Sequence, residues 1–250
     1  MRNFGLIGYP LSHSFSKKYF TDKFEKEGYR ECTYENFQVP DEEALSGFFS
    51  NLPALSGFNI TIPWKEKMLP FLHWQSPAVK SIGACNCVRI ENGKTHGFNT
   101  DVKGFTDSLL PLLKPAHNKA LILGTGGASK AVAHALRELG IAFLFVSRNP
   151  VKGSVTYAAL DEKIISSHPL IINTTPLGMH PDIEAAPDLP YQYIGPGHYL
   201  FDLTYNPAFT SFLRKGAERG ASILNGKEML IIQAEESWRI WNAPFSELIG

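Results

Sequence analysis

Short apolar runs of strand length alternate with longer segments in which apolar residues recur every three or four positions. In the first part of the chain this pattern predicts strands over 4–8, 33–39 and 57–62, and a helix over 16–27 that ends at Gly28. Strands and helices that alternate in this way are typical of α/β proteins, in which helical crossovers join parallel strands. We therefore expect a mostly parallel sheet here.

One segment near the middle departs from this pattern. Between residues 87 and 98, two short extended arms flank the dipeptide Asn92-Gly93. Asn-Gly between two extended arms is a signal of the two-residue turn that joins antiparallel strands. The segment therefore predicts a β-hairpin.

A second α/β series begins after a break at 114–118. It predicts a strand over 120–123 that enters a glycine-rich turn, then a helix over 130–139 and a strand over 143–147. Three further strands and the last helix are predicted over 170–173, 199–203, 221–224 and 227–241. The chain is therefore expected to fold as two α/β units, each with its own sheet.

Charge and composition narrow the classes of function. The sequence has 24 Lys and Arg residues and 24 Asp and Glu residues, so no overall field attracts nucleic acid or an anionic membrane, and we expect neither as a partner. No apolar run approaches the roughly 20 residues of a membrane span, and no signal-peptide pattern is present. The three cysteines are too few for a disulfide-stapled fold and favour the reducing cytoplasm. A small molecule is the expected partner.

The sequence offers no complete metal site. Cys85 and Cys87 lie two apart in an extended segment, where both face the same side. No second pair of Cys or His residues completes the four ligands of a structural zinc. We therefore predict no resident metal.

The glycine cluster Gly124–Gly127 lies between an apolar strand and an amphipathic helix. Glycines in such a turn let the backbone approach a pyrophosphate, whose charge meets the positive end of the helix. A tight turn that binds nothing is the alternative interpretation. The order strand, turn, helix, strand favours a dinucleotide site.

The loop after the next strand indicates which dinucleotide is bound. NAD sites of this kind place a carboxylate there, on the ribose 2′-hydroxyl. This chain instead has Ser147, Arg148, Asn149 and Lys152, which offer positive charge and hydrogen bonds to a 2′-phosphate. We predict NADP in preference to NAD; the alternative is that Arg148 and Lys152 belong to an ordinary solvated surface.

In the first α/β unit, several polar residues lie near strand ends and helix starts, where α/β proteins commonly have their ligand-binding sites. Ser14 and Ser16 precede the first helix, where hydroxyls can meet an anion, although this position alone favours helix capping by Ser16. Asn59 and Thr61 share one face of a strand, and Lys65 follows the strand end, where catalytic groups tend to lie. A lone lysine there is more often simply exposed.

Asp101 ends the segment Asn99-Thr100-Asp101 at the passage into the second series. Taken alone, an acid at this place is typical of a helix N-cap. Without further motifs it carries no catalytic assignment.

Taken together, these motifs resemble those of the shikimate dehydrogenase family, in the same order and over nearly the whole chain. The motifs are Gly8-Tyr-Pro10-Leu-Ser-His13-Ser14-Phe-Ser16, Asn59-Ile-Thr61-Ile-Pro63-Trp-Lys65-Glu66, Gly83-Ala84-Cys-Asn86, Asn99-Thr100-Asp101, Gly124-Thr-Gly126-Gly127-Ala128-Ser129, Ser147-Arg148, Asn173-Thr-Thr175-Pro-Leu-Gly178, Asp202-Leu-Thr-Tyr205 and Gly226-Lys-Glu-Met229 with Gln233. Among the departures, Trp64 stands where the family usually has Phe.

The resemblance implies the reversible reduction of 3-dehydroshikimate to shikimate with NADPH, a step of aromatic amino-acid biosynthesis. It implies an N-terminal α/β substrate domain over 1–101, on which the C-terminal helix within 226–250 packs back. A Rossmann-like NADP-binding domain over 102–225 and a cleft between the domains complete the expected fold. Lys65 and Asp101 become an acid–base pair, in which the lysine ammonium stabilises the carbonyl oxygen and donates a proton while Asp101 keeps it charged. A purely structural ion pair is the alternative.

The resemblance also implies which residues contact each ligand. The substrate is contacted by Ser14, Ser16, Asn59, Thr61, Asn86, Tyr205 and Gln233. The cofactor is contacted by Gly124, Thr125, Gly126, Gly127, Ala128, Ser129, Ser147, Arg148, Asn149, Lys152, Thr175, Leu203 and Gly226.

Two rival functions are compatible with the same motifs. A quinate or quinate/shikimate dehydrogenase that uses NAD or NADP shares the fold and the catalytic pair; the two serines and the basic loop weigh against it. A non-catalytic metabolite sensor is disfavoured because both Lys65 and Asp101 are present and no added interaction segment is visible. The oligomeric state is open between monomer and homodimer.

Overall fold

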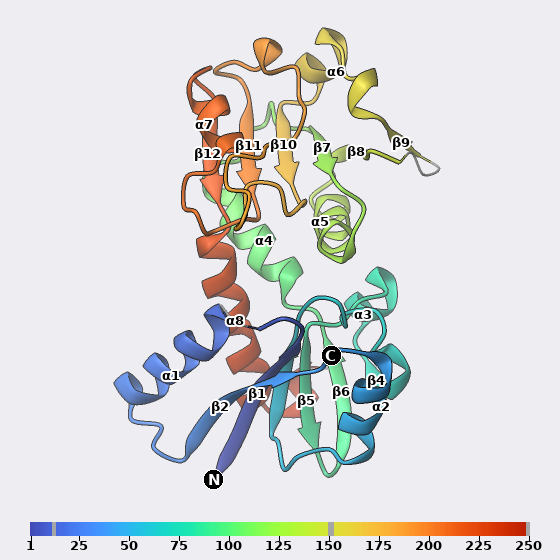
Figure 1. Ribbon diagram of the computed structural model, residues 1–250, viewed down its shortest axis with the longest axis vertical. Coiled ribbons are helices and arrows are strands. Elements are labelled where there is room, and N and C mark those ends of the chain that lie inside the picture. The colour runs from blue at the N-terminus through green and yellow to red at the C-terminus, as the bar shows by residue number, and fades with distance from the viewer. Residues whose placement is uncertain (12–13, 150–152, 249–250) are drawn as a thin grey trace. The chain divides into compact units, whose positions relative to one another are not determined.

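The computed structural model describes residues 1–11, 14–149 and 153–248, and it divides into two compact units (Figure 1). The first unit comprises Met1–Thr100 and the chain from Gln233 onward; the second comprises Asp101–Ile232. In each unit, apolar clusters join helices to both faces of a β-sheet. The predicted α/β fold class is confirmed.

The described residues of the first unit form a six-stranded sheet in the order β2-β1-β3-β5-β6-β4. β1 pairs in parallel with β2 and β3, whereas β5 pairs antiparallel with both of its neighbours. The strands are β1 (Arg2–Gly8), β2 (Cys32–Gln38), β3 (Gly57–Ile60), β4 (Trp74–Gln75), β5 (Cys87–Glu91) and β6 (Lys94–Phe98). The helices are α1 (Phe15–Glu27), α2 (Glu42–Ser50), α3 (Pro77–Ile82), the later part of α8 (Lys227–Asn242) and α9 (Phe245–Leu248).

Two apolar clusters bury the two faces of this sheet. Phe4 of β1 packs with Trp238 and Trp241 of α8 on one face. Ile7 of the same strand belongs to the cluster on the other face, with Leu45 of α2. Because β1 is covered on both sides from Phe4 to Gly8, this part of the strand has no alternation of apolar and polar residues.

The predicted hairpin is confirmed as β5 and β6. Its turn residues Asn92 and Gly93 have φ values of 51° and 71°, as a type I′ turn requires. The reversal also brings the residue before β5 level with the end of β3, because the Ile60 N–H donates to the Asn86 carbonyl (2.9 Å). The hairpin therefore adds Asn86 to the edge at which the parallel strands β1 and β3 end.

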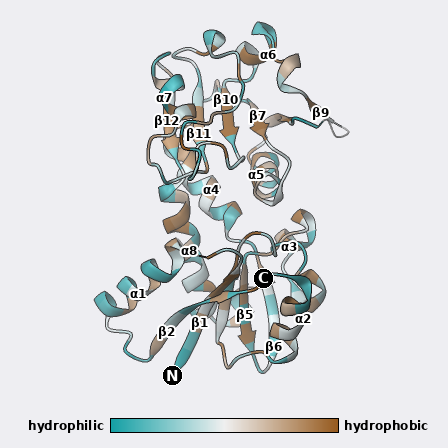
Figure 2. Ribbon diagram, in the orientation of Figure 1, coloured by the Kyte–Doolittle hydropathy of each residue, from teal (hydrophilic) through white to brown (hydrophobic). Residues whose placement is uncertain are grey.

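The described residues of the second unit form a six-stranded sheet in the order β12-β11-β10-β7-β8-β9, in which each pair is parallel. This is the strand order of a Rossmann fold. The strands are β7 (Lys119–Leu123), β8 (Ala142–Val146), β9 (Ser154–Val155), β10 (Leu170–Asn173), β11 (Tyr199–Asp202) and β12 (Ser222–Asn225). The helices are α4 (Asp101–Leu109), α5 (Gly127–Glu138), α6 (Glu162–Ser167), α7 (Ser211–Ala217) and the start of α8. Figure 2 shows apolar residues concentrated in the central strands β7 and β10.

Two predicted helix starts are corrected by the structure. The helix predicted from Ser16 begins at Phe15, and Ser14 caps it, since the Ser14 Oγ accepts a hydrogen bond from the Lys17 N–H (3.3 Å). The preference for Ser16 as the cap is therefore wrong. The helix predicted from residue 130 begins at Gly127, so the end of the glycine cluster is already the first turn of α5.

Candidate active site

In the second unit the chain order reverses between the central strands β7 and β10. From β7 the sheet continues to β8 on one side, and from β10 it continues to β11 on the other. Loops that leave the carboxyl ends of two such strands diverge, and ligands of open α/β sheets bind at this point. The loops concerned here are Gly124–Gly127 after β7 and Thr174–Leu177 after β10, and Thr175 lies in the second of them.

Gly124 lets these two loops touch. Its φ of +103° is one that side chains disfavour, and a Cβ there would lie 2.9 Å from Thr174 Oγ1. Both the backbone conformation and the contact therefore require glycine at this position.

The glycine loop leads directly into α5 and leaves its N-terminus open. Gly126 is the N-cap, and no described side chain accepts a hydrogen bond there. The buried Ser129 hydroxyl instead donates to the Gly126 carbonyl (2.6 Å), which fixes the turn. Because the first N–H groups of a helix lack partners within the helix and carry its positive dipole end, this loop fits a pyrophosphate. Thr125 and Ala128 complete the same loop and first turn.

The loop after β8 carries the residues predicted for the 2′-phosphate. The Ser147 N–H donates to Val155 O of β9 (3.0 Å), and Arg148 and Asn149 are exposed. Since β8 lies beside β7, these residues leave the sheet next to the glycine loop. Lys152 lies outside the described residues.

Leu203 directly follows β11 and Gly226 directly precedes α8, and the two residues are in contact. A Cβ on Gly226 would lie 2.1 Å from Leu203 O, and the Gly226 N–H donates to Thr204 O (3.0 Å). The half-buried Tyr205 follows, and burial raises the pKa of its hydroxyl. This tight backbone junction therefore holds the segment that carries Tyr205.

In the first unit, Asn59 is the centre of a polar network. Its Nδ2 donates to Asn86 O (3.2 Å) and Ser237 Oγ (2.8 Å), and its Oδ1 accepts from the Tyr34 hydroxyl (2.9 Å). Burial raises the pKa of the Tyr34 hydroxyl well above its ordinary value. Because both amide hydrogens of Asn59 have protein partners, its Oδ1 is the atom with remaining capacity, as an acceptor.

Asn86 joins the hairpin to the residues after β6 and to α8. Its Oδ1 accepts from the Thr100 N–H (2.7 Å), and its Nδ2 donates to Thr100 Oγ1 (3.0 Å) and Gln233 Oε1 (3.4 Å). Asn86 is 3% exposed, so these bonds fix its amide. The structure thus brings Asn59, Asn86 and Gln233 into one hydrogen-bond network.

Ser14 and Thr61 lie at the beginning of α1 and just after β3. The Thr61 N–H donates to Ile7 O (2.9 Å), which continues the pairing of β3 with β1 by one residue. Both side chains are half-buried. Because Ser14 follows β1 in the chain and Thr61 follows β3, both residues lie after the strand ends that Asn86 adjoins.

Lys65 follows in a turn that is anchored on both sides. The neighbouring Trp64 is 2% exposed and its Nε1 donates to Val39 O (2.8 Å), while Lys65 O accepts from the Cys85 N–H (2.7 Å). The Lys65 side chain is half-buried.

Asp101, 4% exposed, is the first helical residue of α4 rather than its N-cap, and it belongs to the second unit.

Sequence reasoning missed Tyr34, Thr100 and Ser237 as members of the network. Each is a polar side chain that is almost fully buried. Such groups need hydrogen-bond partners, so a polar residue within an apolar run is a usable signal. Ser237 beside Trp238 has this character, but the sequence does not tell which face of the helix is covered.

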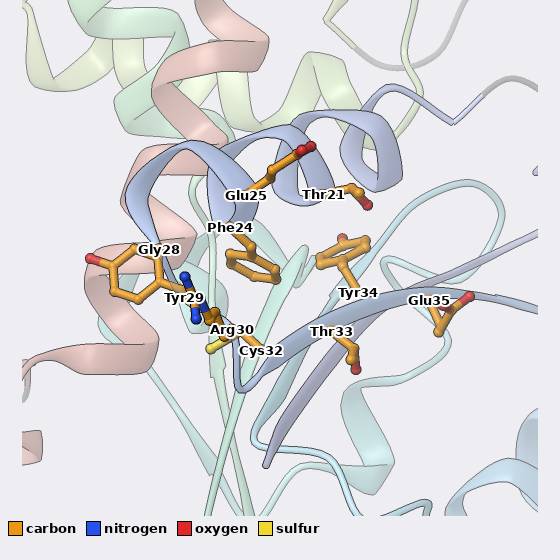
Figure 3. Close-up of a pocket in the computed structure, with 10 residues that line it drawn as sticks. All are labelled: Thr21, Phe24, Glu25, Gly28, Tyr29, Arg30, Cys32, Thr33, Tyr34 and Glu35. Carbon is orange, nitrogen blue, oxygen red and sulfur yellow. The ribbon is translucent and has the colours of Figure 1, made fainter.

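A separate cavity of about 540 Å³ lies between α1 and the edge strand β2 (Figure 3). Its lining carries charges of both signs, from Glu25, Arg30 and Glu35. Tyr34 also lines it, yet its hydroxyl is bonded to Asn59 on the network side. None of the predicted site residues lines this cavity, so it is not part of the candidate active site.

Across residues 1–11, 14–149 and 153–248, no group of three or more His, Cys, Asp or Glu side chains could hold a metal ion. Within the same ranges, no helix has the length and apolar character that a membrane span needs.

Comparison with known proteins gives consistent matches. Residues 6–88 match the shikimate dehydrogenase substrate binding domain family. The shikimate dehydrogenase (NADP(+)) of Thermus thermophilus is 36% identical over 259 residues, which cover 100% of this chain and 96% of that protein. The solved structure of shikimate 5-dehydrogenase from Thermus thermophilus in complex with NADP(H) and shikimate is similar with a TM-score of 0.87 and 34% identity, covering 97% of this chain and 94% of that one. A quinate dehydrogenase from Corynebacterium glutamicum in complex with NAD has a TM-score of 0.83 and 25% identity, covering 96% and 93% of the two chains.

Proposed function

The chain belongs to the shikimate dehydrogenase family, and from this premise we propose that it catalyses the reversible, NADPH-dependent reduction of 3-dehydroshikimate to shikimate. The observation that carries the proposal is the similarity, over nearly the whole chain, to enzymes named for NADP(+) and to a structure with both NADP(H) and shikimate. The quinate dehydrogenase is similar at a lower identity of 25%. We therefore rank quinate as the second substrate to test.

NADP binding is assigned to the second unit. The open N-terminus of α5 and the loop Gly124–Gly127 offer N–H donors and positive potential to the pyrophosphate. Arg148 supplies the charge that favours a 2′-phosphate over a 2′-hydroxyl. When bound, NADPH supplies the hydride that reduces the substrate ketone.

Substrate binding is assigned to the first unit. The hydroxyls of Ser14 and Ser16 bind the carboxylate at the start of α1, where the helix dipole also favours an anion. Asn59 accepts a hydrogen bond from a ring hydroxyl, because Oδ1 is the atom whose capacity is not used up by Tyr34, Asn86 and Ser237. Thr61, Asn86, Gln233 and Tyr205 complete the contacts to the ring.

Lys65 and Asp101 are proposed as the acid–base pair. Reduction of a ketone leaves negative charge on its oxygen, and an ammonium stabilises that charge and donates the proton. Asp101 is proposed to orient the Lys65 ammonium for this proton transfer. In the direction of shikimate oxidation, Lys65 accepts the hydroxyl proton instead.

We propose that the two units correspond to the substrate domain and the NADP domain, with the end of the chain from Gln233 belonging to the first. A reducing cytoplasm suits the protein because all three cysteines, each within the described residues, are thiols. The oligomeric state, monomer or homodimer, is measured by light scattering on the same preparation.

The test is the change in absorbance of the reduced nicotinamide with purified protein, supplied with shikimate or quinate and with NADP or NAD in all four combinations. Fast turnover with shikimate and NADP supports the proposal. Turnover mainly with quinate or with NAD moves the assignment to the quinate dehydrogenase. Ligand binding without turnover in any combination indicates the metabolite sensor.

A further inference from the structure

Asp202, the last residue of β11, is a fully buried carboxylate to which the proposed reaction gives no part. Its Oδ1 accepts hydrogen bonds from Asn173 Nδ2 (3.0 Å) and the Thr204 N–H (3.0 Å), and its Oδ2 accepts from Thr210 Oγ1 (2.6 Å). These partners are neutral. A buried charge that is held by neutral donors alone is costly, so its retention calls for a reason beyond stability.

The partners of Asp202 come from three connections at the carboxyl end of the sheet. Asn173 ends β10, directly opposite Asp202 in the register. Thr204 leads to Tyr205, and Thr210 is the N-cap of α7. One carboxylate therefore ties together the exit of β10, the exit of β11 and the start of α7.

Asn173 connects Asp202 to the loop after β10, which lies beside the glycine turn. Its Oδ1 accepts from both the N–H (3.1 Å) and the hydroxyl (2.6 Å) of Thr175. On the other side of the loop, the Thr174 N–H (3.0 Å) and hydroxyl (2.6 Å) donate to Leu123 O, immediately before Gly124. The loop after β10 is thus held between β7 and, through Asn173, Asp202.

The Asp202 carboxylate determines which group donates and which accepts in each of these hydrogen bonds. An ionised carboxylate only accepts, so the NH₂ group of Asn173 must face Asp202 and its oxygen must face Thr175. The opposite orientation would place the amide oxygen against the carboxylate and the NH₂ group against a backbone donor. Asp202 therefore determines which end of Asn173 meets the loop.

We propose that Asp202 is a positioning residue for cofactor binding, whose acceptor oxygens orient Asn173 and so fix Thr174 and Thr175 against the glycine loop. This role rests on the proposed NADP-dependent function. It assigns Asp202 no contact with cofactor or substrate.

If Asp202 has this role, two substitutions of it should have different effects on NADP binding. Asp202→Ala removes all the acceptors. Asp202→Asn can keep Oδ1 toward Asn173 and Thr204 and turn its NH₂ group toward Thr210, whose hydroxyl can accept instead of donate. The asparagine variant should therefore preserve the loop, and the alanine variant should not.

The experiment measures kcat, the KM values for NADP and shikimate, and the Kd for NADP by titration calorimetry. Asp202→Ala is expected to raise the KM and Kd for NADP about tenfold with a smaller change in the KM for shikimate, and Asp202→Asn to restore both to within about twofold. Asn173→Ala should match Asp202→Ala, and the double variant should be no worse than either, because one chain of bonds is broken in each case.

His117→Ala is the control for general destabilisation. His117 is 3% exposed, accepts the Lys114 N–H at Nδ1 (3.0 Å) and precedes β7, so it lies at the opposite end of the same sheet. It should lower the Tm and leave the Kd for NADP unchanged.

Folded Asp202→Ala and Asn173→Ala variants that bind NADP like the wild type would overturn the role, as would an Asp202→Asn variant as impaired as the alanine variant. If Asp202→Ala does not fold, Asn173→Ala and Asp202→Asn decide by the same measurements. A wild type that binds no NADP removes the proposed function together with this role, whereas unchanged variants of an NADP-binding wild type remove this role alone.

Discussion

The two units use different kinds of polar group in the loops that follow the carboxyl ends of their strands. In the second unit the donors for an anion are backbone N–H groups, supplied by the glycine loop and the open start of α5. In the first unit the polar groups are side chains, with Asn59, Asn86 and Gln233 oriented by buried hydrogen bonds. The backbone donors come from one local turn, which Asn173 and Asp202 support from the neighbouring strand ends, whereas the side-chain site needs partners from β2, β3, the hairpin and α8.

This difference follows from what each ligand presents. A pyrophosphate is a diffuse anion that any outward-pointing N–H group can bind. A ring with several hydroxyls requires donors and acceptors at defined places, and a site that leaves one buried group unpaired discriminates strongly. The first unit should therefore discriminate among ring substrates through individual side chains.

The largest effect is expected from Lys65→Ala. Loss of the general acid should lower kcat about 10²–10⁴-fold, with a smaller change in the KM for shikimate. Lys67→Ala is the matched control, because Lys67 lies two positions on, where it pairs with Glu42 and approaches the Trp64 ring (5.6 Å). Near-normal turnover by Lys65→Ala would exclude its proposed role and weaken the contrast between the units.

The second effect is a pH dependence of stability in the second unit. Burial raises the pKa of Asp202 from an ordinary 3.8 to about 6, so the native state binds this proton more tightly than the unfolded chain does. The resulting stability is fully present below pH 3.8 and is lost as the pH rises through 6. The free energy of unfolding of the wild type, relative to Asp202→Asn, should therefore fall by about 2 kcal/mol between pH 4 and pH 7.

Urea unfolding of the two proteins across this pH range measures the difference. A constant difference would mean that Asp202 titrates as it does in the unfolded chain.

The third effect concerns Arg148, the one exposed cation of the described 2′-phosphate loop. Arg148→Ala should weaken NADP binding about tenfold and leave NAD binding almost unchanged, because the charge acts on the phosphate that NAD lacks while the backbone holds the pyrophosphate. Ratios of kcat/KM for the two cofactors measure this. Arg219→Ala, an exposed arginine after α7, serves as the control. Equal losses with both cofactors would contradict the assignment.

The smallest effect is expected from Ser237→Ala in the first unit. The Asn59 NH₂ group loses one acceptor, so the amide becomes less well oriented and the KM for shikimate should rise about three- to tenfold. Ser46→Ala is the matched control, since its hydroxyl donates to the carbonyl four residues earlier (3.0 Å), as that of Ser237 does (2.9 Å), but it is exposed. A variant with unchanged KM would show that Asn59 is oriented without Ser237.

Much of the fold was predictable because local patterns carry it. The Asn92-Gly93 turn, the strand Leu170–Asn173 and the strand–glycine–helix motif depend on neighbouring residues only. Short elements such as α3 and β9 were missed, since few residues leave no periodicity to detect. The start of α1 was misjudged because Ser14 and Ser16 are both good N-caps, and only the path of the chain chooses between them.

The sequence by itself determined the α/β class, the family and the residue types of the two sites. Those follow from periodicity and from collinear motifs, which are properties of the chain alone. The tertiary structure decided which polar groups share hydrogen bonds. Tyr34 and Ser237 reach Asn59, and Asp202 reaches Asn173, across long separations in sequence. Burial then fixes these partners, because a polar group removed from water must be paired, and only packing determines what is removed from water.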